Sequence, residues 1–194
     1  MKTGMQRLLL FAVLLISSGP ELSAQQAREA DGAGLGSLSR GVYGRTSSGW
    51  KKMDLIMQSG FHTRHGASGF VGVMPGGVYE YTGPSAQQQF ENQRPVFGIV
   101  TGPPNASAPG ENLRDVVIVR MSSKKDHREV AIVHGGFASS RTGINSKDTV
   151  EAELTPISDH AYTLTPKKDL KPGEYLITTR AVYGARGYDF GVKR

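Results

Sequence analysis

Hydrophobic and polar residues alternate with a period of two in several short stretches, which is the pattern of β-strands with one covered face. The clearest examples are residues 149–155 and 187–193. The residues that share the predicted covered face are Val150, Ala152 and Leu154 in the first stretch, and Tyr188, Phe190 and Val192 in the second. Both stretches are therefore predicted to be half-buried strands, with Glu151, Glu153 and Asp189 on the other face.

Two further stretches, Val116–Val119 and Val130–Val133, are continuously apolar. Continuous apolar runs are expected where both faces of a strand are covered. The polar residues Ser122–His127 lie between the two runs and indicate a hairpin loop. We therefore predict that the two runs pair with each other at the centre of the fold.

Short β-forming stretches bounded by turn residues recur along the chain from residue 41 onward. Gly41–Thr46 and Trp50–Met53 flank a glycine-containing loop and predict a hairpin. Further strands are predicted at residues 70–73, 78–82, 96–101, 115–121, 128–134, 160–165 and 175–180. Many short strands without an amphipathic helix of useful length predict an all-β fold. Specifically, they favour an antiparallel immunoglobulin-like β-sandwich with an N-terminal β-hairpin or sheet extension.

The most specific local motif combines Leu170, Pro172, Gly173 and Tyr175. Pro172 presets φ and Gly173 permits a positive φ, so the pair favours a turn. A Pro-Gly turn followed by a tyrosine is typical of a tyrosine corner, in which the hydroxyl returns to backbone a few residues upstream. We predict that Tyr175 buries its ring and places its hydroxyl on backbone near Lys171.

The first 24 residues have the three parts of a secretory signal peptide. Lys2 and Arg7 form the basic start, Leu8–Ile16 forms the apolar core, and small or turn-forming residues lead to Ala24. The apolar core is short against the about 20 residues of a membrane-spanning helix. We expect cleavage after Ala24, export to the periplasm or the medium of a bacterium, and no transmembrane segment in the mature chain.

Composition divides the rest of the chain into four parts. Residues 25–39 are rich in alanine, glycine, glutamine and serine, which predicts a flexible leader with order beginning near Arg40. Residues 40–82 are predicted as an N-terminal hairpin and sheet unit, 83–94 as a polar loop, and 95–194 as the immunoglobulin-like sandwich.

The chain contains no cysteine, which excludes disulfides and a lipid-modified N-terminal cysteine. The formal net charge is +6, and loss of Lys2, Arg7 and Glu21 with the signal leaves +5. Three lysine pairs lie far apart in the sequence, each beside a predicted turn, and we interpret them as solvated loop charges: Lys51-Lys52, Lys124-Lys125 and Lys167-Lys168. No nucleic-acid-binding motif is present, and we expect no nucleic-acid partner.

Few side chains suggest chemistry. His62 and His65 are spaced as metal ligands on a helix would be, but Gly60, Gly66 and Gly69 surround them and disfavour a helix. We therefore expect no metal site and no cofactor. No nucleophile elbow occurs, and Glu151 and Glu153 point out of one strand side by side rather than across a cleft, which does not suit glycoside cleavage. No catalytic residue is therefore assigned, and the protein is not expected to be an enzyme.

Aromatic residues are concentrated in the predicted N-terminal unit, where they are Tyr43, Trp50, Tyr79 and Tyr81. Exposed rings on a sheet can stack on sugar or peptide, whereas core packing is the default role of such rings. The sequence leaves both roles open for these four residues.

From Gly41 to the end, the chain resembles uncharacterised, mostly bacterial exported proteins. The resemblance rests on Gly41-Val42-Tyr43 with Trp50, the Val116–Val133 hairpin, Asp169–Tyr175 and the closing Tyr188–Val192. It implies an envelope or secreted β-protein and carries over no catalytic residue. The corner is also similar to that of fibronectin type III and immunoglobulin-like domains, but antibody domains have two cysteines, and Ile177 stands where the second would fall.

These observations lead to the expectation of a non-enzymatic exported protein that binds or assembles with an envelope or extracellular component, either protein or polysaccharide. The alternative is a hydrolase or carbohydrate-binding module. Its site would lie in the loops Gly83–Arg94 and Gly102–Leu113 or in the N-terminal aromatic cluster.

Overall fold

A computed structural model describes residues 34–63, 77–102, 113–133, 143–144, 147–180 and 186–193. These residues form β-strands, nearly all antiparallel, and two short 3-10 helices, η1 (Leu35–Ser37) and η2 (Leu113–Asp115). The predicted all-β class is therefore confirmed. In the part of the chain described, no helix is long and apolar enough to span a membrane. The predicted signal peptide, the predicted strand at residues 70–73 and His65 lie outside the described residues.

The first sheet has five strands in the order β12-β13-β7-β1-β2. Their bounds are β12 (Ala152–Ser158), β13 (Ala161–Pro166), β7 (Phe97–Val100), β1 (Gly41–Thr46) and β2 (Gly49–Lys52). Strand β7 is central because it pairs with β1 on one side and with β13 on the other. The predicted hairpin of β1 and β2 is present, with Thr46 opposite Gly49.

The second sheet is a path of seven strands in the order β3-β15-β14-β8-β9-β5-β4, with three short strands paired beside it. The path comprises β3 (Leu55–Met57), β15 (Arg186–Val192), β14 (Gly173–Thr179), β8 (Val116–Ser123), β9 (His127–Val133), β5 (Gly77–Thr82) and β4 (Gly60–Thr63). The short strands are β6 (Gln89–Phe90), which runs parallel to β15, β10 (Gly143–Ile144) on β9, and β11 (Thr149–Val150) on β8.

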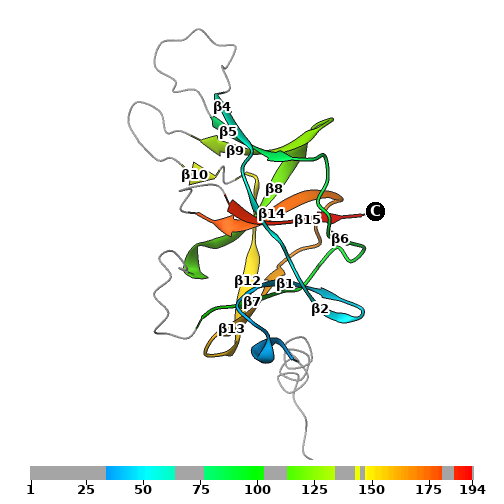
Figure 1. Ribbon diagram of the computed structural model, residues 1–194, viewed down its shortest axis with the longest axis vertical. Helices are drawn as coiled ribbons and strands as arrows, with labels where there is room; N and C mark the ends of the chain where they lie inside the picture. Colours follow the sequence, from blue (N-terminus) through cyan, green and yellow to red (C-terminus); the bar gives the residue numbers. More distant parts are fainter. Residues whose placement is uncertain are drawn as a thin grey trace, which may run out of the picture.

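This second sheet folds over between β8 and β9, so the molecule has three layers. Only Ser122 with Glu129 and Ser123 with Arg128 pair across the β8–β9 hairpin. We call β3, β15, β14 and β8 the middle layer, and β9, β5 and β4 the outer layer. In Figure 1 the outer layer lies at the top, the middle layer below it and the first sheet lowest.

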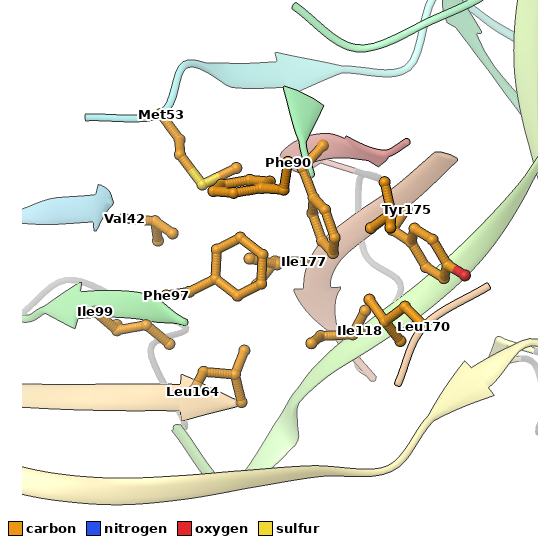
Figure 2. Packing of buried hydrophobic residues seen from close by; sticks show 12 residues of the cluster. Val42, Met53, Phe90, Phe97, Ile99, Ile118, Leu164, Leu170, Tyr175 and Ile177 are labelled. Atoms are coloured by element: carbon orange, nitrogen blue, oxygen red, sulfur yellow. The ribbon is translucent and has the colours of Figure 1, made fainter. Parts of the chain in front are cut away.

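One hydrophobic core joins the first sheet to the middle layer. Its aromatic centre is formed by Phe97, Phe90, Phe190 and Tyr175, and Figure 2 shows how the side chains from the two sheets meet. The ring centroids of Phe97 and Phe190 are 4.5 Å apart, and Tyr175 stacks on Phe190 at 5.3 Å. Offset and tilted ring pairs of this kind add to the stabilisation from buried area.

A second core joins the middle layer to the outer layer. Its buried members are Tyr81, Val117, Val119, Met121, Val130 and Leu176. Strand β8 serves both cores, because Ile118 belongs to the first one. The prediction that both faces of the Val116–Val119 run are covered is therefore confirmed.

The predicted pairing of the two apolar runs is wrong. Val119 lies opposite Leu176 of β14, and Val130 lies opposite Tyr79 of β5. The runs pack against each other across a core rather than side by side in a sheet. The hairpin loop was placed correctly, but the sharp fold after two residue pairs sends β9 into a different layer.

Three other expectations are corrected. The last part of the predicted flexible leader is ordered, because Leu35 in η1 is fully buried and packs over Gly98, where a Cβ would meet a Leu35 methyl at 2.3 Å. The predicted strand at 149–155 is divided at Glu151 into β11 and β12, which pair in different sheets. Strand β15 is covered on both faces rather than one, since Asp189 is largely buried.

Strands from residues 40–82 are shared among all three layers. Strand β1 pairs with β7, β3 with β15, and β5 with β9. Even the predicted loop 83–94 contributes β6 to the middle layer. The structure thus does not set residues 40–82 apart as a sheet of their own.

Candidate functional site

The tyrosine corner has the geometry that its sequence suggests. The Tyr175 hydroxyl donates to the carbonyl oxygen of Lys171 at 2.6 Å, and the ring is buried in the first core. Gly173 has φ 150°, and Leu170 is buried beneath the turn. Here the chain leaves β13 of the first sheet and enters β14 of the middle layer. Burial raises the pKa of the Tyr175 hydroxyl above its ordinary value, with a smaller opposing effect of Arg120.

The structure does not bring the four N-terminal aromatic residues together on one sheet. Tyr43 and Trp50 lie on the first sheet, while Tyr79 and Tyr81 lie on the outer layer. Tyr43 is buried with its hydroxyl donating to the Ser39 carbonyl oxygen at 2.6 Å, and Tyr81 is buried in the second core. The proximity in sequence was misleading because the strands between them cross from one layer to another.

A buried ionic network lies between the middle and outer layers. Arg128 of β9 is 3% exposed, forms a very short contact with the carboxylate of Asp189, and has its Nη1 3.7 Å from Glu174 Oε2. Its guanidinium also donates to the carbonyl oxygens of Thr82 and Gly83, each at 3.0 Å. Arg128 therefore connects strands from both layers.

The same network fixes the segment 83–94. The backbone N–H of Ala86 donates to Glu174 Oε2 at 2.7 Å, and Gln89 Nε2 donates to Glu174 Oε1 at 3.2 Å. Ala86 and Phe90 are buried. The polar groups of this segment thus hold the fold together, which weakens the alternative of a hydrolytic site here. Residues 103–112, most of the other loop in that alternative, lie outside the described residues.

A second polar cluster lies on the face of the outer layer that points away from the middle layer. Glu80 of β5 stands directly opposite Glu129 of β9. His62 Nδ1 of β4 is 2.7 Å from Glu80 Oε1. His127 Nε2 is 3.3 Å from Glu129 Oε1 and 3.9 Å from Glu80 Oε1. We call these four residues the outer cluster.

Two charged neighbours complete this cluster. The Asp126 carboxylate is 2.7 Å from His127 Nδ1, and Lys124 Nζ is 3.5 Å from Glu129 Oε2. The hydrogen bond that the His127 ring donates to the Asp126 carboxylate, and next the one to Glu129, raise the pKa of His127 above its ordinary value of 6.5. The same bond lowers the pKa of the Asp126 carboxyl. Among the described residues, no three histidine or acidic side chains are arranged to hold a metal ion.

A hollow of about 510 Å³ lies where β8 ends and β14 begins. Arg120, Ser122, Asp148 and Glu174 line it. Glu174 is already bound to Ala86 and Gln89, and Arg120 Nη2 donates to the carbonyl oxygen of Pro172 at 3.4 Å. The lining is polar, but two of its charged side chains, Arg120 and Glu174, already have partners within the fold.

The most unusual surface belongs to a single segment, Gly49–Thr63, which we call the edge segment. It supplies β2, at one edge of the first sheet, and then β3 and β4, at the two ends of the second sheet. Figure 1 shows it in cyan, running from β2 to β4 along the length of the molecule. The exposed large hydrophobic side chains of the described residues all belong to it, and they are Leu55 (50%), Met57 (67%) and Phe61 (51%).

Sequence reasoning missed both the outer cluster and the edge segment. His62 was recognised, but its partners come from β5 and β9, and only strand pairing brings them to it. The residues of β3 and β4 were not predicted as strands. A signal was present in the apolar Leu55, Ile56 and Met57, although three residues are too few to show a period.

Comparison of the chain with protein-family models, with curated proteins and with solved structures finds no match. The resemblance to exported bacterial proteins therefore stays a prediction.

Proposed function

We propose that this chain is an exported, non-enzymatic, immunoglobulin-like β-sandwich protein of the bacterial periplasm or extracellular space. It binds or assembles with another envelope or extracellular component through its edge segment. The observation that carries the proposal is the concentration of exposed apolar side chains on strands that are paired on one side.

The strand order supports the immunoglobulin-like part of the proposal. Immunoglobulin-like domains have one sheet in the order A-B-E-D and another in the order C-F-G. If β1, β7, β8, β12, β13, β14 and β15 are labelled A to G, the first sheet contains the series A-B-E-D, from β1 through β7 and β13 to β12. The middle layer then contains the series C-F-G, from β8 through β14 to β15. The tyrosine corner then falls between strands E and F, as it does in such domains. The strands β2 to β6 then form an insertion between A and B, and β9 to β11 form another between C and D.

The edge segment supports the binding part of the proposal. Within the described residues, β3 pairs only with β15, and β4 pairs only with β5. An unpaired strand edge can accept an added strand from a partner, and alternate side chains then give specificity. Apolar side chains at Leu55, Met57 and Phe61 favour an extended partner segment with apolar residues of its own. Lys51 and Lys52 on exposed positions of β2 favour acidic residues beside them.

Export is tested by the N-terminus of the mature protein. The order of basic start, apolar core and small residues predicts cleavage after Ala24, so N-terminal sequencing of the protein from the native envelope or medium should begin at Gln25. A stable species in the cytoplasm that retains Met1 would contradict both the export and the proposed partner.

Binding is tested by photo-crosslinking in the native host. A photoreactive phenylalanine analogue placed at Met57 or at Phe61 should give a discrete adduct with a partner, because both positions lie on the edge segment. The matched control is the same analogue at Lys168, which is exposed in the turn between β13 and β14. The proposal fails if Met57 and Phe61 give no adduct, or if Lys168 gives the same one.

A further inference from the structure

The face of the first sheet that points away from the middle layer is positively charged at its β1–β2 end. Residues 32–53 contain four lysine or arginine side chains and no aspartate or glutamate. Arg45 lies opposite Trp50, and Lys52 lies opposite Tyr43, so these four side chains share one face. Tyr43 and Trp50 pack in the cluster that contains η1, which identifies this face as the outer one.

Stacking holds the charged group of Arg45 in place. Its Cζ atom lies 5.1 Å from the centroid of the Trp50 ring, which is a cation–π contact. A stacked guanidinium keeps its N–H donors at its rim, where their planar fork matches a carboxylate. Neither Arg45 nor Lys52 forms an ion pair with a described residue. Arg45 is partly exposed and Lys52 is exposed, so both charges are accessible to a ligand.

The two cations are too far apart to share one small anion. Lys52 stands opposite Tyr43, two residues from Arg45 along β1. The Lys52 stem extends further over Gly41, where a Cβ would meet Lys52 Cε at 3.0 Å. Two to four residues of a strand span about 7 to 13 Å. A single carboxylate therefore contacts one cation, whereas a polymer with a carboxylate on successive units contacts both.

The surroundings of the two cations favour a hydrated polymer. The exposed large hydrophobic side chains of the described residues lie on β3 and β4, so they provide no apolar anchor for a membrane at this face. Tyr43 is buried, and Arg45 covers one face of the Trp50 ring. Nucleobases that bind by stacking need open aromatic rings, which these two residues do not offer.

We propose that the outer face of the β1–β2 hairpin binds an acidic polysaccharide. Arg45 and Lys52 each bind one carboxylate of the polymer, and Trp50 orients the Arg45 fork. The site lies on the face of the first sheet and does not use the apolar side chains of β3 and β4. It therefore stands whether or not the edge segment binds a partner.

The site contains its own reporter, because Trp50 is the single tryptophan of the chain. Tryptophan emission of the full mature chain is followed during addition of polygalacturonate, with neutral dextran as the control polymer. We expect a saturable change with polygalacturonate and none with dextran. Calorimetry gives the dissociation constant, which should rise with salt because salt screens exposed charges.

Lys51 offers a matched control, because it is exposed and adjacent in sequence but lies opposite Gly44 on the other face of the sheet. Arg45→Gln and Lys52→Gln should each raise the dissociation constant by about fivefold or more, since each removes a charged donor. Lys51→Gln removes the same charge and should raise it by less than about twofold. Calorimetry is used for the variants because Arg45→Gln changes Trp50 emission by itself, and thermal unfolding verifies that each variant is folded.

Two results with polygalacturonate would overturn the proposal. One is the absence of binding at low salt. The other is a Lys51→Gln variant that is weakened as much as Lys52→Gln, because net charge rather than this face would then control binding. Competition with phosphatidylglycerol vesicles and with a single-stranded oligonucleotide identifies other ligands. If either displaces polygalacturonate at a lower concentration of charge, the face binds lipid or nucleic acid and the proposal is wrong.

Discussion

Replacing Arg128 with methionine is expected to lower the free energy of unfolding by about 3 to 5 kcal/mol, because removing one partner of a buried ion pair leaves uncompensated charge. Two largely buried carboxylates, Asp189 and Glu174, would lose their common cation. The carbonyl oxygens of Thr82 and Gly83 would also lose their donors. Urea denaturation measures the change, which should move the midpoint without a large change in slope.

Two variants show whether the loss comes from the buried charges. Arg186→Met makes the same substitution at an exposed position of β15 and should change the unfolding free energy by less than about 0.5 kcal/mol. Arg128→Met combined with Glu174→Gln and Asp189→Asn should recover about 2 kcal/mol of the loss, since no unpaired charge remains. If the triple variant is no more stable than Arg128→Met, the network acts through packing instead.

Replacing Tyr175 with alanine is expected to lower the free energy of unfolding by about 3 to 5 kcal/mol, because it removes a ring from the centre of the first core. The ring stacks on Phe190, and its hydroxyl donates to the Lys171 carbonyl oxygen. Tyr175→Phe removes only the hydroxyl and should cost about 0.5 to 1.5 kcal/mol. Both values come from chemical denaturation of the mature chain.

The control is Tyr162→Phe, whose hydroxyl donates to the Asp159 carbonyl oxygen at 3.3 Å in an exposed bond, and we expect almost no change there. The decisive contrary result would be a Tyr175→Phe variant of unchanged stability that no longer forms the crosslinked adduct. Tyr175 would then belong to a binding site.

Features set by neighbouring residues could be predicted from the sequence. Pro172, Gly173 and Tyr175 are close enough for local turn chemistry to specify the corner. The alternation of Tyr188, Phe190 and Val192 placed these side chains correctly in the first core. In each case the information lies within a few residues, so tertiary packing had little to add.

Features that depend on the third layer could not be predicted. Asp189 has the sequence pattern of a solvent-facing residue, yet its side chain is largely buried and contacts Arg128 from a strand of the outer layer. The apolar run of β8 indicates that both faces are covered but does not identify the covering strands. Residue periodicity reports whether a face is covered, whereas the identity of its neighbour depends on contacts between distant parts of the chain.

Leu35 illustrates the same limit at the level of composition. A stretch of alanine, glycine and serine predicts flexibility, because such residues bury little apolar surface. Leu35 is nevertheless buried over Gly98 of β7, which leaves room for it, and Leu38 packs beside the same cluster. An average over fifteen residues cannot show these contacts.

The course of the edge segment limits the changes in length that this protein can tolerate. Two residues, Met53 and Asp54, connect β2 to β3, and two more, Gln58 and Ser59, connect β3 to β4. Met53 is buried in the first core, and the Ser59 N–H donates to the Glu80 carbonyl oxygen at 2.7 Å. A one-residue insertion in either connection would have to form a bulge or turn every following side chain to the opposite face. We therefore expect a change in the number of residues between Gly49 and Thr63 to disturb more than one layer of the fold at once.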